Sequence, residues 1–232
     1  MLKLNNKSKK LLLLQRNELL TERQKWTRKK FGRYIFTNFF INFNQAKDIE
    51  QNVENLFKNE IETFKYFLPK SIDRIMDIGC GLGIIDIFLN KFYNNKPIFY
   101  LLDKNHIDKK IKYGFSPNYE SYNNLNETKN ILLQNNIDID HIHLFDVDKE
   151  IKISKKIDLV ISLKSMGYHY PIEIYLELFK KTCTPDTTFI FDVSEGYFNE
   201  NLFKKYFESS SIIYEEKSKH SLKRMFCTKF KI

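Results

Sequence analysis

The sequence predicts an α/β fold: a doubly wound, mostly parallel seven-stranded sheet with an antiparallel C-terminal hairpin strand and an N-terminal helical cap. From residue 72 onward, short β-branched and aromatic runs alternate with stretches of helical periodicity, which is typical of parallel strands joined by crossover helices. The last two strand-like runs have no helix between them, so we expect a hairpin that adds an antiparallel strand at the edge. The 232 residues, 42% of them apolar, suffice to bury such a core.

The predicted cap is the basic and aromatic segment 1–46. Residues 1–33 contain eleven Lys or Arg and two Glu, whereas residues 34–232 contain 27 basic and 27 acidic residues. The whole excess of positive charge therefore lies at the N-terminal end. Aromatic residues follow the cations directly, which favours a lid over a ligand site ahead of a nucleic-acid surface. The cations and rings in question are Trp26, Arg28, Lys29, Lys30, Arg33 and Tyr34.

Residues 47–232 are the predicted sheet domain, with an insertion at about 104–125. It opens with an amphipathic helix over 48–68, because apolar residues recur at steps of three and four until Pro69 stops the pattern. The predicted strands are Ile72–Asp77, Ile98–Asp103, His141–Asp146, Asp158–Leu163, Thr188–Val193, Ile212–Glu216 and Lys223–Phe230. The predicted helices lie near residues 84–93, 126–135, 172–182 and 198–207.

Composition argues against several other classes of protein. The longest aliphatic run, Leu11–Leu14, is far shorter than the roughly 20 residues of a membrane span, so we expect no membrane association and a cytoplasmic location. Three scattered cysteines are too few for a disulfide framework or a zinc cluster. His141 and His143 alternate along a predicted strand and are interpreted as structural, so no metal site is expected.

A glycine-rich turn, Met76-Asp77-Ile78-Gly79-Cys80-Gly81-Leu82-Gly83, connects the first predicted strand to the next helix. Glycines let the backbone turn tightly under a ligand, and the helix N-terminus offers unpaired N–H donors. The nicotinamide fingerprint would need a third glycine at position 84, where this chain has Ile84. The run D-I-G-C-G-L-G instead resembles motif I of class I S-adenosylmethionine-dependent methyltransferases, and the order of elements over residues 48–232 is similar to theirs.

This resemblance implies S-adenosyl-L-methionine as cofactor and assigns its contacts. Asp77 would hold the methionine ammonium, with the glycine turn beneath that moiety. Asp103, closing the second strand, would accept hydrogen bonds from both ribose hydroxyls, and Asp146, closing the third, would bond the adenine amino group. Further cofactor contacts are expected at Gly79, Cys80, Gly81, Gly83, Lys104, Val147 and Ser162. Cys80 is interpreted as a small loop residue and not as a nucleophile.

The loop after the fourth strand is expected to carry the acceptor side of the reaction. It lacks the Asn-Pro-Pro-aromatic pattern of amino-methylating DNA enzymes and the paired Glu of arginine methyltransferases. His169, whose ordinary pKa is near 6.5, is the predicted catalytic base, since it can take a proton from a hydroxyl at neutral pH. The predicted substrate contacts are Lys164, Tyr168, Tyr113 and Tyr122.

These features favour O-methylation of a polar small molecule, with a sugar or a nucleotide-linked sugar as the expected acceptor. The basic cap is compatible with a phosphorylated acceptor. Three alternatives stay open at this point: N-methylation of a small amine, methylation of RNA through the basic segment, and a non-catalytic scaffold that only binds the cofactor. Nucleic acid is the less favoured partner.

Overall fold

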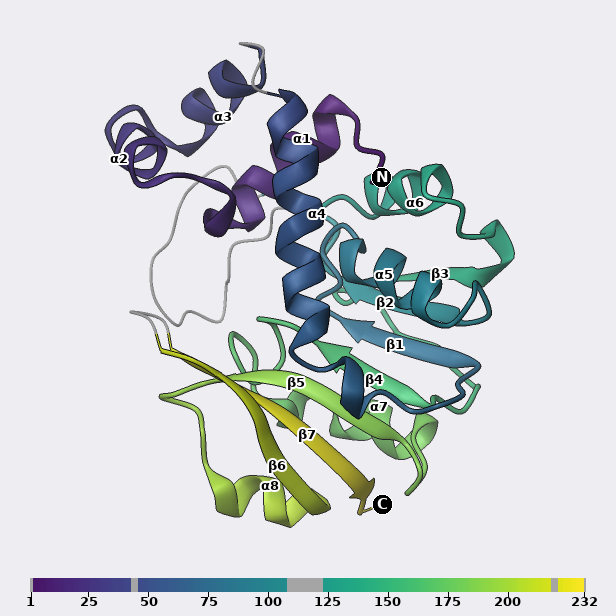
Figure 1. Ribbon diagram of the computed structural model, residues 1–232. Helices are drawn as coiled ribbons and strands as arrows, with labels where there is room; N and C mark the ends of the chain where they lie inside the picture. The colour runs from purple at the N-terminus through teal and green to yellow at the C-terminus, as the bar shows by residue number, and fades with distance from the viewer. Residues whose placement is uncertain (1, 43–45, 108–122, 218–220, 232) are drawn as a thin grey trace.

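A seven-stranded sheet forms the centre of the molecule. The computed structural model describes residues 2–42, 46–107, 123–217 and 221–231 (Figure 1). Within these residues the strand order is β3-β2-β1-β4-β5-β7-β6; the first five pair parallel, and β7 runs antiparallel to both of its neighbours. The strands are β1 (Arg74–Ile78), β2 (Ile98–Asp103), β3 (Ile142–Asp146), β4 (Leu159–Ser162), β5 (Thr188–Ser194), β6 (Phe207–Glu216) and β7 (Leu222–Phe230).

The predicted C-terminal hairpin is confirmed, and its antiparallel strand is the inner of the two. β7 lies between β5 and β6, with Arg224 opposite Asp192. Most side chains of β7 are buried or half-buried, whereas most of those of β6 are exposed, so the more apolar strand takes the inner position. β6 also begins at Phe207, well before the predicted Ile212, because this polar stretch pairs with β7.

Apolar side chains are buried on both faces of the sheet, as parallel sheets require. Ile75 and Leu101 belong to one core, and Met76 and Leu102 to the other, because successive side chains of a strand point to opposite faces. α4, α5 and α6 cover the first face, and α7 and α8 cover the second (Figure 1). Their bounds are α4 (Ala46–Glu62), α5 (Ile84–Phe92), α6 (Leu125–Gln134), α7 (Leu176–Thr182) and α8 (Glu200–Tyr206).

Two predicted helices end or begin differently from the sequence pattern. α4 stops at Glu62, short of the predicted residue 68, because the Thr63 hydroxyl donates to the carbonyl of Glu60 (2.6 Å) and a separate 3-10 turn follows at Lys65–Phe67. The predicted helix 172–182 is a 3-10 turn, Ile172–Tyr175, that continues as α7. Both differences fall at helix ends, where local hydrogen bonds decide the geometry.

The N-terminal segment is helical and contributes to the main core. It comprises α1 (Asn6–Gln15), a 3-10 turn (Asn17–Leu19), α2 (Glu22–Phe31) and α3 (Arg33–Asn42). Leu11–Leu14 are buried in the same hydrophobic cluster as Val53 of α4 and Leu132 of α6. α1 is therefore packed into the sheet domain, while α2 and α3 lie farther from the sheet (Figure 1). No helix within the described ranges is long and apolar enough to cross a membrane.

Candidate functional site

The turn from Gly79 to Gly83 joins the end of β1 to the start of α5. Its three glycines have φ values of 75°, 54° and 69°, which residues with a side chain rarely adopt. A Cβ atom at position 79 would overlap the hydroxyl of Ser165, and one at position 81 would lie 3.1 Å from the amide oxygen of Gln15. The glycine turn is therefore left-handed and closely covered by the loop after β4 and by the end of α1.

Asp103, the last residue of β2, is bonded directly to this turn. One carboxylate oxygen accepts the N–H of Gly81 (2.7 Å), and the other accepts the N–H of Lys104 (2.7 Å). Burial raises the pKa of Asp103 to about 6, against the lowering effect of these hydrogen bonds. The carboxylate can still accept further donors, because each oxygen has two lone pairs.

Asp146 ends β3 in register with Asp103, so the two carboxyl groups leave the sheet at the same edge. The Asp146 carboxylate accepts the N–H of Asp148 (3.2 Å) and lies 3.6 Å from the ammonium of Lys149. The N–H of Val147 donates to the carbonyl of Asp103 (3.1 Å). The structure thus brings together the glycine turn, Asp103 and Asp146, as the sequence predicts.

Two residues near the turn were missed by sequence reasoning. The Asn123 side-chain amide and the Thr128 hydroxyl both donate to the carbonyl of Gly81, each at 2.8 Å. Asn123 precedes α6 and Thr128 belongs to it, so α6 supports the turn from the side of β2. Hydrogen bonds to one backbone oxygen leave no periodic pattern that the sequence could reveal.

Asp77 and Asp86 form a buried pair of carboxyl groups behind the turn. Their residues are 2% and 0% exposed. Burial, and after it the neighbouring Asp86 carboxyl, raises the pKa of Asp77 well above its usual range, and burial raises the pKa of Asp86 to about 7. The positive charge of Arg16, from the N-terminal segment, acts in the opposite direction on the pKa of Asp77. A cationic ligand group beside Asp77 would stabilise the ionised form of its carboxyl group next to Asp86.

The pair predicts a pH-dependent stability. A carboxyl group whose pKa is raised by folding stabilises the protein below its ordinary pKa, and that contribution is lost as the pH rises through about 7. Asp86→Asn removes the ionisation. Between about pH 5 and pH 8, the free energy of unfolding should fall by roughly 2 to 4 kcal/mol less in this variant than in the wild type.

Urea unfolding at both pH values measures this difference, and the exposed Asp186→Asn is the matched control. Equal pH dependence in wild type and Asp86→Asn would show that Asp86 does not hold a proton in the folded protein.

The loop after β4 is tied to the glycine turn. The Ser162 hydroxyl donates to the carbonyl of Ile78 (2.6 Å) and accepts the N–H of Met166 (2.9 Å). Ser162, predicted to contact the cofactor, is fully buried, and its side chain connects β1 to the loop. Ser165, next along, is the residue that closes over Gly79.

His169 sits on a compact turn in this loop. The carbonyl of Ser165 accepts the N–H groups of Tyr168 (3.1 Å), His169 (2.7 Å) and Tyr170 (3.2 Å). The His169 ring packs edge-on against Tyr168, with centroids 4.8 Å apart, and the surrounding protein lowers the pKa of His169 by desolvation. Its imidazole is therefore neutral at neutral pH, which is the form that can accept a proton.

Lys164, predicted to contact a substrate, is paired with acidic side chains in this structure. Its ammonium pairs with Glu18 of the N-terminal segment and lies 3.9 Å from a carboxylate oxygen of Glu216 at the end of β6. Two carboxylates thus surround one ammonium, and the pair with Glu18 fastens the N-terminal segment to the loop. In this arrangement Lys164 positions neighbouring segments of the protein.

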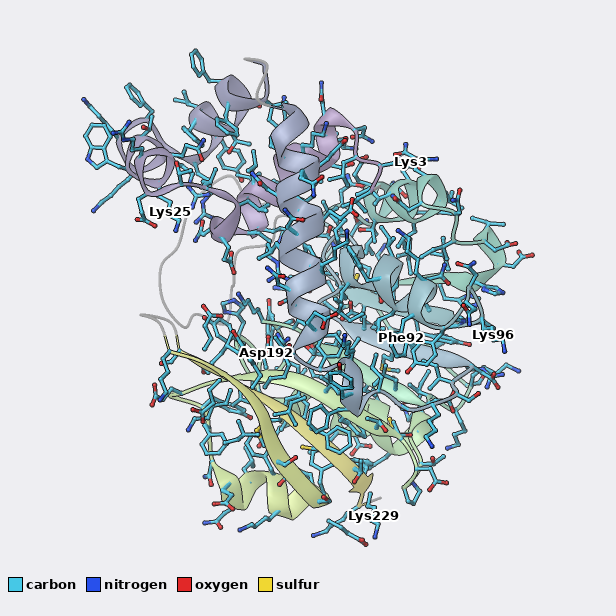
Figure 2. All side chains as sticks on the ribbon, viewed as in Figure 1. Lys3, Lys25, Phe92, Lys96, Asp192 and Lys229 are labelled. Atoms are coloured by element: carbon cyan, nitrogen blue, oxygen red, sulfur yellow. The ribbon has the colours of Figure 1, made fainter. Side chains whose placement is uncertain are left out.

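A buried ion-pair network behind the loop was also missed. Both carboxylate oxygens of Asp192 accept from the Arg224 guanidinium (2.7 and 2.9 Å), and one of them also accepts the N–H of Lys164 (3.2 Å). Glu60 of α4 then bridges Arg224 to Arg16, at 3.4 Å on each side. Asp192 belongs to β5 and is labelled near the lower end of α4 in Figure 2. The network joins the N-terminal segment, α4, β5, β7 and the loop.

The remaining predicted site residues divide into two groups. Tyr113 and Tyr122, predicted to contact the substrate, lie outside the described residues, as does most of the insertion. Lys104 is described, and its ammonium lies 5.7 Å from the centre of the Tyr170 ring, in the loop after β4. Cys80 is buried, and burial raises the pKa of its thiol, as expected of an unreactive cysteine.

Solved structures with the same arrangement identify the fold. The O-MT segment of StiE superposes with a TM-score of 0.52 at 13% identity, covering 85% of this chain and 82% of that one. The chain has the fold of the class I S-adenosylmethionine-dependent methyltransferases. In this fold the carboxyl ends of β1, β2 and β4 lie at one edge of the sheet, and the glycine turn, Asp103 and the loop that carries His169 follow at that edge.

Two further methyltransferase structures are similar. A proposed O-methyltransferase from Nostoc punctiforme has a TM-score of 0.50 at 10% identity and covers 77% of this chain and 61% of that one. A 16S rRNA methyltransferase of T. thermophilus, in complex with AdoMet and guanosine, has a TM-score of 0.50 at 13% identity and covers 73% of this chain and 41% of that one. No protein-family model and no curated protein matches the chain by sequence. The similarity of this chain to these proteins is therefore a similarity of fold.

Proposed function

We propose that the chain is an S-adenosylmethionine-dependent methyltransferase. One observation carries this proposal: the Asp103 carboxylate is bonded to Gly81 of a left-handed glycine turn and stands in register with Asp146. The residues fit the cofactor. The glycine turn is left-handed at Gly79, Gly81 and Gly83, and the buried Asp77 is a ready partner for an ammonium group. When bound, the cofactor supplies a methyl group activated on a sulfonium.

The proposed contacts follow from the donors and acceptors present. Asp103 accepts hydrogen bonds from the ribose hydroxyls, because its two oxygens can each take a further donor. Asp146 faces the same edge and accepts from the adenine amino group. Asp77 holds the ammonium of the methionine moiety, which favours ionisation of its carboxyl.

The proposed acceptor is a sugar hydroxyl, and the proposed base is His169. The neutral imidazole takes the hydroxyl proton as the acceptor oxygen approaches in line, since a hydroxyl is a weak nucleophile until it loses that proton. The hydrogen bonds around the Ser165 carbonyl hold the imidazole on a fixed turn next to Gly79. Orientation of the acceptor and removal of one proton are the main tasks left to the protein.

Calorimetry tests the cofactor assignment. Asp103→Ala is expected to weaken S-adenosylmethionine binding by about 2 kcal/mol, or roughly 30-fold, because two charge-assisted hydrogen bonds are lost. Asp186→Ala is the control, since this exposed residue precedes β5 at the opposite end of the sheet. Unchanged affinity in a folded Asp103→Ala variant would overturn the assignment, and no measurable binding to the wild type would overturn the proposed function.

A further inference from the structure

One face of α2 combines positive charge with exposed aromatic rings. Arg23, Lys29 and Lys30 lie three or four residues from Trp26 along the helix, so all four side chains share one face. Trp26 is 65% exposed and the following Phe31 is 55% exposed. The Lys30 ammonium lies over both rings, 5.4 Å from the centre of Trp26 and 5.8 Å from that of Phe31. We call these five residues the cationic–aromatic face.

The helix that carries this face is held in place from behind. Thr21 and Gln24 form a capping box at its N-terminus. Arg28, on another side of the helix, donates to the carbonyl of Leu13 (3.1 Å) and to the side chain of Asn17. Gly32, at φ 87°, then turns the chain into α3, where Phe36 is buried. The cationic–aromatic face is thus presented by a helix anchored to α1 and α3.

Positive charge dominates the helix that carries this face. The helix α2 carries five basic residues, Arg23, Lys25, Arg28, Lys29 and Lys30, and one acidic residue, Glu22, which is paired with Lys25 (2.7 Å). A polyanion is therefore the complementary partner.

The arrangement of the rings favours single-stranded nucleic acid over other polyanions. A helix that lies on a membrane segregates its rings and cations to opposite faces, whereas here Trp26 stands among three cations. A duplex offers mainly phosphates to such a surface, but unpaired bases can stack on exposed rings while the cations contact the backbone.

The face also lies close to the proposed catalytic loop. Glu18, in the 3-10 turn before α2, pairs with Lys164 of that loop. Arg23 follows Glu18 by five residues, so the two backbones are at most about 18 Å apart. This distance corresponds to a few nucleotides of an extended strand.

We propose that the cationic–aromatic face binds single-stranded RNA and delivers one of its nucleotides to the site as the methyl acceptor. This inference rests on the proposed function and names its substrate class. A ribose hydroxyl within RNA is a sugar hydroxyl, so the proposed base His169 and this surface are compatible.

Trp26 provides a direct measurement, because it is the single tryptophan of the sequence. A single-stranded RNA of about 12 nucleotides should quench the fluorescence of the full-length protein on titration, with an affinity that falls as salt is raised. The triple variant Arg23→Gln, Lys29→Gln, Lys30→Gln should bind at least 10-fold more weakly at about 50 mM salt, and the magnitude of its log–log salt slope should fall by about 2. Trp26→Ala, followed through labelled RNA, should weaken binding by about 5- to 100-fold.

The control removes the same charge elsewhere, in the variant Lys180→Gln, Lys204→Gln, Lys229→Gln, whose lysines are exposed on α7, α8 and β7. The control variant should bind RNA with an affinity within about twofold of the wild type. The magnitude of its log–log salt slope should fall less than that of the face variant. Transfer of a labelled methyl group to RNA should fall in the face variant and persist in the control.

Several results would overturn the inference: equal RNA binding by the face variant and the wild type, a Trp26 response to anionic lipid vesicles but not to RNA, or methyl transfer to a free nucleotide-linked sugar and none to RNA. Failure of the proposed function is separate, since it appears as loss of S-adenosylmethionine binding in calorimetry. Asp103→Ala should weaken cofactor binding and leave RNA quenching unchanged.

Discussion

His169→Ala is expected to lower the turnover of methyl transfer by about 10²- to 10⁴-fold, the usual contribution of a general base. The affinity for S-adenosylmethionine should change little, because the proposed cofactor contacts lie on the glycine turn and on the ends of β1, β2 and β3. The rate should rise with pH through the titration of the imidazole. Since desolvation lowers the pKa of His169, this rise falls below the ordinary value near 6.5 and the rate is level at neutral pH.

Two conservative variants distinguish the contribution of the imidazole to the rate from that of the neighbouring phenols. Tyr168→Phe and Tyr170→Phe remove phenolic hydroxyls on the same turn and should keep most of the activity. Turnover is compared with saturating cofactor, and cofactor affinity is measured alongside by calorimetry. A near-wild-type rate for His169→Ala would remove His169 from the mechanism and favour an amine acceptor, which can attack before it loses its proton.

Arg224→Gln is expected to lower the free energy of unfolding by about 3 to 5 kcal/mol, because it leaves the Asp192 carboxylate buried without its bidentate partner. Arg224 is 2% exposed and Asp192 is 0% exposed. The same replacement also frees Glu60 from one of its two arginines. Urea unfolding followed by circular dichroism measures the effect.

The matched control lies on the same strand. Lys229 forms an exposed ion pair with Glu208 at 3.5 Å, so Lys229→Gln should cost less than about 1 kcal/mol. The double variant Arg224→Met, Asp192→Leu should be more stable than Arg224→Gln, since it removes both charges. An unfolding midpoint for Arg224→Gln equal to that of the wild type would contradict the importance of this pair.

Much of the sheet follows from local sequence. Each strand of the parallel part is a short apolar run of β-branched and aromatic residues, and β2 keeps its predicted bounds, Ile98–Asp103. The glycine turn could be located because only glycine tolerates its left-handed backbone. Asp103 and Asp146 could be placed together because parallel strands end at one edge of the sheet.

Other features arise only from contacts between distant segments. Lys164 could not be recognised as a positioning residue from sequence, because its partner Glu18 lies 146 positions away. Asp77 and Asp86 are close in sequence, yet only the packing around them excludes water from both and raises the pKa of each.

The sequence by itself determined the alternation of strands and helices, the glycine turn after the first strand and the concentration of positive charge in residues 1–33, because periodicity, glycine and charge are properties of local segments. Tertiary structure alone decided that β7 lies inside β6, that α1 joins the core, and that Arg16, Glu60, Arg224 and Asp192 form one network. These outcomes depend on which buried surfaces and charges find partners across the fold, and burial is a property of the whole chain.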